Sequence, residues 1–208
     1  MSVLVVAKTV ARGRYCVGGL TDDGTSLRLT DRLGNYPPRT TPFEVGQRWD
    51  MDYAPSPQLV APHVEDVRVR RRDRLDDEED VAGSIQRLVE PWRGDLRATF
   101  GGLLGYTGTS RGYIQQPDVP DQSTGFWIPN ADLERVVEGN KTIYEIETRG
   151  FMRVRITRRI TYVGAAPSIP RIPAGTLVRL SLARWWRPGD ADDDFPERCY
   201  LQLSGWYL

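Results

Sequence analysis

The stretch LVRLSLARWW, residues 177–186, decides the class of fold. Its apolar residues share one parity: Val178, Leu180 and Leu182. The residues of the other parity, which include Arg179 and Trp185, fall on the opposite side of an extended chain. This alternation predicts a β-strand with one buried face. Because neighbouring residues of a strand point to opposite faces, Trp185 and Trp186 cannot both enter the same core.

Strand patterns of this kind occur in two groups along the chain. They cover residues 3–8, 15–20, 26–30, 43–53 and 63–72, and then 125–129, 142–147, 151–163, 177–186 and 200–208. The sequence TDDG at 21–24 is typical of a hairpin turn between two of them. Five short antiparallel strands bury a core when they close into a barrel. We therefore expect an all-β fold with one short helix, built from two tandem OB-like β-barrels; a single mixed β-sandwich is the alternative.

The middle of the chain has a different composition. The charged run DRLDDEED, 73–80, is followed by the one helix pattern, with apolar residues at 85, 88, 89 and 92 and a stop near Pro91. The glycine-rich segment 101–112 then predicts a long loop or an irregular hairpin. We therefore divide the chain into a first barrel at 1–72, a connector at 73–122 and a second barrel at 123–208.

The charge composition limits the possible partners. The chain has 28 Lys plus Arg and 28 Asp plus Glu, so it has no net charge that would attract a polyanion at long range. Any site for nucleic acid must therefore be local. No apolar span of about 18 residues and no charged-then-apolar leader occurs, so we expect a cytoplasmic protein without a membrane partner.

Residues for metal binding or catalysis are scarce. Cys16 and Cys199 are far apart and fit no zinc spacing, and His63 is the only histidine. We expect two reduced thiols, and a histidine that meets a backbone carbonyl at the start of a strand. The aspartates at 190–194 lack the glycine and the final glutamate of a calcium loop, and they indicate a solvated turn. The sequence thus predicts no metal, no cofactor and no catalytic residue.

Aromatic and arginine side chains are the candidates for ligand binding. If the C-terminal strand pairs with 177–186, one surface presents Trp185 and Trp206 beside Arg179, where bases would stack. The alternative is that these tryptophans plug barrel ends or cover the interface between the halves. The arginine face of 151–163 offers phosphate contacts, and a solvated strand face is its alternative. The candidate nucleic-acid-binding residues are Trp185, Trp186, Trp206, Arg153, Arg155, Arg159, Arg179 and Arg184.

Several phrases of the sequence resemble a known family. They are KT at 8–9, CVGGL at 16–20, FEVGQRWD at 43–50, PHVEDV at 62–67, STGFWIP at 123–129, IPAGTLVRLSLARWW at 172–186 and CYLQLSGWY at 199–207. Their order is similar to that in bacterial proteins described as containing a dual OB domain, over essentially the whole chain. The resemblance implies two OB-type barrels and a nucleic-acid-binding role, and it brings no active-site residue with it.

We therefore expect a protein that binds single-stranded DNA or RNA by aromatic stacking and arginine–phosphate contacts. One alternative is a protein-interaction module, since tryptophan and arginine also anchor protein interfaces. Another is an enzyme or binder of a small ligand or nucleotide that uses the glycine-rich segment 101–113 as a flap.

Overall fold

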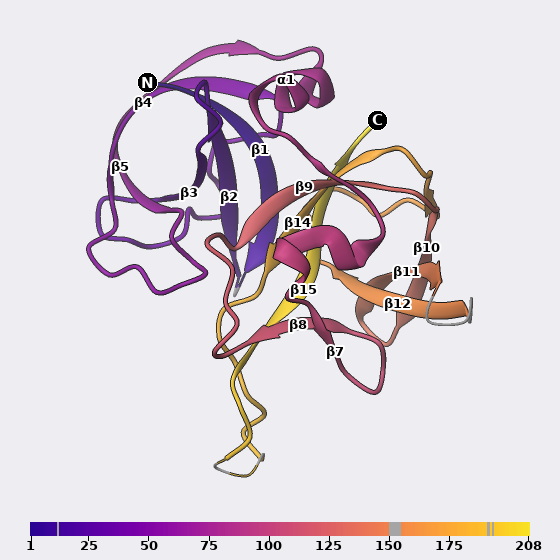
Figure 1. Ribbon diagram of the computed structural model, residues 1–208. Helices are drawn as coiled ribbons and strands as arrows, with labels where there is room; N and C mark the ends of the chain where they lie inside the picture. The colour runs from indigo at the N-terminus through magenta and orange to yellow at the C-terminus, as the bar shows by residue number, and fades with distance from the viewer. Residues whose placement is uncertain (12, 150–154, 191, 193) are drawn as a thin grey trace.

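The computed structural model describes residues 1–11, 13–149, 155–190, 192 and 194–208. Two β units pack side by side, with a short helix at one edge of their interface (Figure 1). In the described part of the chain no helix is both long and apolar enough to cross a membrane.

The first unit is a closed five-stranded barrel. Its strands are β1 (Ser2–Ala11), β2 (Arg14–Thr21), β3 (Ser26–Thr30), β4 (Gln47–Pro55) and β5 (Asp66–Asp77). They are ordered β1-β2-β3-β5-β4, with β1 paired to β4. Only the β3–β5 pair is parallel within this barrel. The predicted TDDG turn joins β2 to β3, where Gly24 supplies the positive φ of 83° that tight turns require. This is the strand order of an OB barrel.

The second unit repeats this strand order. It contains β9 (Thr124–Pro129), β10 (Leu133–Glu138), β11 (Lys141–Arg149), β12 (Arg155–Tyr162), β14 (Leu177–Leu182) and β15 (Arg198–Tyr207). These strands follow the order β10-β11-β12-β15-β14-β9. The first and the last strand of this order, β10 and β9, are joined by residues 130–132 alone, so together they correspond to the single first strand of the barrel. The β12–β15 pair is parallel, like β3–β5 in the barrel. Two short strands extend the ends of the path: β13 (Arg171–Ile172) beside β10, and β6 (Trp92–Gly94) beside β9. The expected all-β fold of two OB-like units is confirmed.

The middle segment joins the two units. Asp80 is the N-cap of helix α1 (Val81–Leu88), and its side chain accepts a hydrogen bond from the Gly83 N–H at 2.7 Å. The helix ends earlier than its apolar pattern predicts, because Val89 is already extended and Pro91 cannot continue a helix. A 3₁₀ segment, η1 (Leu96–Gly102), follows. The glycine-rich stretch then forms the irregular hairpin of β7 (Gly105–Tyr106) and β8 (Gly112–Gln115), and β8 pairs with β15. The division at residues 72 and 122 stays a prediction, and β5 crosses the first of these boundaries.

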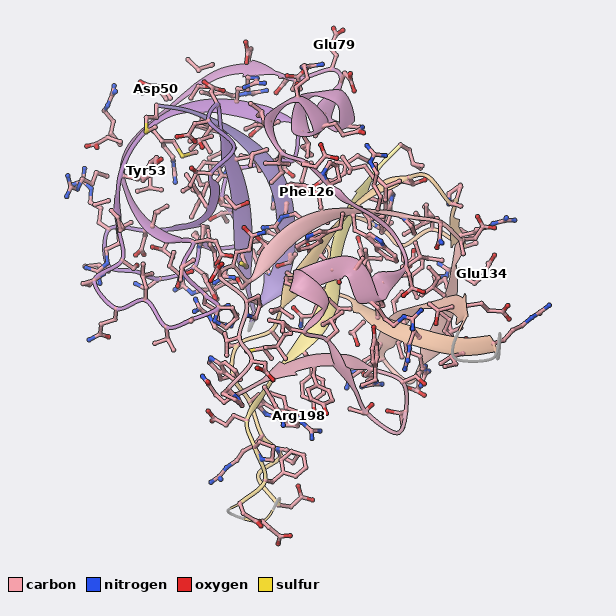
Figure 2. All side chains as sticks on the ribbon, in the orientation of Figure 1. Asp50, Tyr53, Glu79, Phe126, Glu134 and Arg198 are labelled. Atoms are coloured by element: carbon pink, nitrogen blue, oxygen red, sulfur yellow. The ribbon has the colours of Figure 1, made fainter. Side chains whose placement is uncertain are left out.

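An apolar cluster fixes the two units to each other. It comprises Leu4, Val6, Leu20, Ile85, Phe126, Leu177 and Tyr207. These residues come from β1, β2, α1, β9, β14 and β15, and Phe126 lies on β9 where the units meet (Figure 2). Backbone hydrogen bonds add to the contact, since the Val10 N–H donates to Val163 O at 3.1 Å and the Ala165 N–H to Lys8 O at 2.8 Å. The relative position of the barrels is therefore set by packing and by main-chain pairing.

Candidate functional site

A cavity of about 500 Å³ lies where the two units meet. One wall is the outer face of β2 and β3, where Gly18 pairs with Arg28. The facing wall comes from β14, through Arg179 and Ser181. OB barrels generally bind ligands on the face of their second and third strands and at the neighbouring loops. The cavity therefore lies on the face of the first barrel that corresponds to the usual ligand face of OB folds, and the second barrel forms its other side.

Two corresponding loops lie beside this cavity, and one of them lines it. Residues 56–65 join β4 to β5, and residues 183–197 join β14 to β15. The second of these loops projects away from the body at the bottom of Figure 1. The Trp185 Nε1–H donates to Ala61 O at 2.8 Å, and His63 Nε2 lies 3.1 Å from Ala183 O. The expected contact of His63 with a backbone carbonyl is confirmed, although it comes from the loop before β5. Burial, with Arg28 and Arg184 nearby, lowers the pKa of His63 to about 3, so this imidazole is neutral at pH 7.

Arg28 is buried but fully engaged. Its Nη1 donates to Asp66 Oδ1 at 2.8 Å and its Nη2 to Ser123 Oγ at 2.8 Å. The carboxylate of Glu65, also buried, lies 4.0 Å from the same guanidinium and accepts a hydrogen bond from the Ser123 hydroxyl at 2.8 Å. This network joins β3 and the loop before β5 to the start of the second barrel. Arg28 is thus a structural cation whose charge is balanced within the protein.

Arg179 is buried without such a balance. Its side chain has one hydrogen bond within the described chain, from Nη1 to Ser204 Oγ at 3.2 Å; its Nε has no partner there, and no described carboxylate forms an ion pair with it. Burial is the main cause that lowers the pKa of this guanidinium; Arg28 also lowers it, whereas Tyr207 and the more distant carboxylate of Glu65 raise it, and arginine stays protonated in proteins. A Cβ on Gly18 would lie 2.9 Å from Arg179 Nη2, so glycine at position 18 makes room for the group. The cavity therefore holds an uncompensated positive charge, which is costly when empty of an anion.

The mouth of the cavity carries two tryptophans and a further arginine. Trp185 and Trp186 both line it, and the Trp186 side chain, 52% exposed, meets Tyr200 edge-on at 6.0 Å between ring centroids. Arg184 forms an ion pair with Asp66 and keeps 45% of its side chain exposed. Tyr36 lies beside it, with its hydroxyl 3.5 Å from Arg184 Nη2. The arrangement offers flat aromatic surface at the opening and positive charge inside.

Comparison with known protein families fits this geometry. The family model of the dual OB-containing domain matches residues 1–206. The chain belongs to this family. No curated protein and no solved structure matches it. Membership supports a general role in binding nucleic acids or oligosaccharides, as OB folds do.

The dual OB architecture brings together four of the eight residues that the sequence singled out. Trp185, Trp186, Arg179 and Arg184 line the one cavity. Arg28 and Gly18 belong to the same site, and the sequence interpretation missed them. The alternation of SLRLT, 26–30, does place Arg28 on the outer face of its strand, but no local signal shows that a second barrel covers that face.

Trp206 lies elsewhere, and the predicted surface shared with Trp185 is wrong. The strands 177–182 and 198–207 do pair, but a register shift between Arg179 and Leu180 sets Trp206 opposite the buried Val178. The indole consequently packs against the core of the second barrel, 5.0 Å from the Tyr162 ring, and lines a separate cavity of about 400 Å³. Such a bulge reverses the face of every residue beyond it.

The arginines of β12 are also outside the cavity. Arg159 pairs with Glu145 at 3.1 Å and Glu138 at 3.2 Å, and Arg155 lies 3.6 Å from Glu147 with its side chain 82% exposed. Arg153 is outside the described residues. The partners of the two described arginines come from β10 and β11, so their geometry matches a solvated, salt-bridged strand face.

The glycine-rich segment does not line the cavity of the dual OB domain. The Arg158 guanidinium lies 3.6 Å from the Tyr106 ring centroid, and that of Arg198 lies 4.1 Å from the Tyr113 centroid. Arg111 forms an ion pair with Glu138 at 2.9 Å. These contacts hold the segment against the second barrel.

Thiol and metal chemistry give no further site. Cys16, which lines the cavity, and Cys199 are both free, and burial raises the pKa of the Cys199 thiol to about 12. Among the residues that the structure describes, no group of three His, Cys, Asp or Glu side chains is placed to hold a metal ion.

Proposed function

We propose that the chain binds single-stranded nucleic acid at the cavity between its barrels, with Trp185 and Trp186 stacking on bases and Arg179 and Arg184 meeting phosphate. The observation that carries the proposal is the buried guanidinium of Arg179, which has no carboxylate partner within the described chain. An anionic ligand would supply the missing charge.

The combination of groups favours nucleic acid over an oligosaccharide. A neutral sugar stacks on tryptophan but leaves Arg179 uncompensated, whereas a nucleotide offers both a flat base and a negative phosphate. A volume of about 500 Å³ falls in the range of about 300–1,000 Å³ that small-ligand sites occupy. The cavity therefore has room for one nucleotide unit, with the rest of the strand lying outside its mouth.

A titration of tryptophan fluorescence with short DNA and RNA oligonucleotides tests this proposal. We expect a change in emission on binding, and an affinity that falls as the salt concentration rises because phosphate contacts release counterions. Substitution W186A should weaken binding by about 1–3 kcal/mol, the value of one stacking platform.

Arginine variants locate the site. R184M should weaken binding, while R155M, which removes an exposed arginine outside the cavity, should leave it unchanged. If neither DNA nor RNA binds at low salt, the proposal is wrong. Equal losses in R184M and R155M would also refute it, because binding would then depend on total charge.

A further inference from the structure

The cavity leads from an open mouth to a buried interior. Trp186 and Arg184, at the mouth, are about half exposed. The inner residues Arg28, Arg179 and Thr124 are 6%, 5% and 3% exposed. The exposed part of the lining also includes Val10 of β1, so a ligand that reaches Arg179 enters between β1 and the loop that carries the tryptophans.

Beyond Arg179 the space between the two sheets is filled. Leu20 lies two residues past Gly18 on the same face of β2, and Leu177 lies two residues before Arg179 on the same face of β14. Both leucines belong to the apolar cluster that holds the units together. Contacts between the units close the two sides: on the side of β1 the Val10 N–H donates to Val163 O at 3.1 Å, and on the side of β3 the Arg28 Nη2 donates to Ser123 Oγ at 2.8 Å. The inner end of the cavity is closed to a chain that would continue through it.

Two buried polar groups in the inner part of the cavity have no partner within the described chain. They are the Nε–H of Arg179 and the Oγ1 of Thr124. Both residues line the cavity, and Thr124 pairs across β9 and β14 with Ser181, which also lines it. Buried polar atoms are nearly always hydrogen-bonded, so these two point to a ligand with several acceptor oxygens.

From this geometry we infer that the inner end of the cavity receives the terminal phosphate monoester of a nucleic-acid strand. An internal phosphodiester continues in both directions, and its second arm has no way out past Leu20 and Leu177. A terminal monoester has one covalent attachment, three acceptor oxygens and a charge of about −1.5 to −2 at pH 7. It can thus accept from Arg179 and Thr124 while the neighbouring base lies against the tryptophans. This inference rests on the proposed function and specifies which part of the strand enters.

Oligonucleotides of one sequence with different ends test it. The probes are a strand with a 5′-phosphate, a strand with a 3′-phosphate, a strand with hydroxyl groups at both ends, and a circular single strand. We expect at least one phosphorylated strand to bind about 10-fold more tightly than the hydroxyl-ended strand, as one or two charged hydrogen bonds provide. The circle should bind no better than the hydroxyl-ended strand.

Two variants assign the preference to the closed end. R179M and T124V should each reduce the ratio of affinities for phosphorylated and hydroxyl-ended strands, and R155M should keep it. T124V conserves the side-chain shape, so the test stands even if R179M misfolds. Equal binding of phosphorylated, hydroxyl-ended and circular strands would overturn the inference and leave the proposed function in place. Failure of all four probes to bind would instead reject the proposed function.

Discussion

Replacing Arg179 by methionine should stabilise the unliganded protein, even though the side chain is buried. A buried charge without an ion pair costs several kcal/mol after relaxation; repulsion from Arg28 adds to this cost, and attraction to Glu65 offsets part of it. Against this, the substitution loses one hydrogen bond to Ser204 Oγ at 3.2 Å, and a charged hydrogen bond is worth about 1.5–3 kcal/mol. We expect R179M to raise the free energy of unfolding by about 1–3 kcal/mol. Each kcal/mol raises the Tm of a chain of this length by about 2–4 °C.

Arg28 provides the matched comparison, since it is an equally buried arginine in the same cavity. R28M removes the guanidinium from Asp66 and from the buried Glu65, so Glu65 loses its cation and Asp66 keeps only its ion pair with Arg184. Breaking a buried ion pair from one side costs about 3–5 kcal/mol. The two variants should therefore shift stability in opposite directions.

Urea denaturation at pH 7, followed by circular dichroism and by tryptophan fluorescence, measures both changes. If R179M lowers the free energy of unfolding by more than about 1 kcal/mol, the charge of Arg179 is balanced within the protein and the argument for an anionic ligand fails. Losses of equal size in R179M and R28M would mean that both side chains act through packing alone.

Three further predictions concern pH and packing. The folded pKa of His63, about 3, lies below the ordinary 6.5, so the unfolded chain takes up the proton first and the free energy of unfolding should fall by about 1 kcal/mol per pH unit below pH 6.5. Urea denaturation at pH 7, 6 and 5 should show this slope in the native chain and a flatter one in H63Q; equal slopes would contradict it. G125A should lower the free energy of unfolding by about 1–3 kcal/mol, and the Tm with it, because the new Cβ would lie 2.3 Å from Trp92 Cη2 and overpack the site; an unchanged Tm would show that the ring moves freely. A hydrogen bond from Ser84 is the main reason that the pKa of Glu78 falls to about 2. The ionised Glu78 carboxylate therefore contributes fully to the free energy of unfolding above pH 4.5, and this contribution is lost as the pH falls towards 2. Acid unfolding should begin at higher pH in E78Q, and an unchanged midpoint would exclude this role.

The sequence predicted the fold well because most barrel strands have a clear apolar pattern. Residues 177–182 and 26–30 show it, and both are strands in the structure. The strand at 133–138 was missed, since Val136 and Val137 are adjacent and its alternation is weak. Local patterns thus identified most strands without fixing their bounds.

The site was only partly predictable, because it depends on how the two barrels face each other. The tryptophans at 185 and 186 stood out as exposed aromatics, and they do line the cavity. The register shift at Arg179 moved Trp206 to the core; Gly205, which pairs with Arg179 at the shift, is the one local sign of a bulge in this strand, and the alternation alone did not reveal it. The role of Arg28 was equally hidden, since its partners Asp66 and Ser123 are distant in the sequence.

The cavity has one wall from each barrel, and this has a consequence for fragments of the protein. A piece that retains β2 and β3 keeps Gly18 and Arg28 but lacks Arg179, while a piece that begins after the connector keeps Arg179 and loses the opposite wall. Each half therefore lacks residues that the cavity needs, and neither contains a complete site. Truncation or separate expression of the barrels should therefore abolish recognition outright, and a bisected gene would regain it only if the two products reassociate.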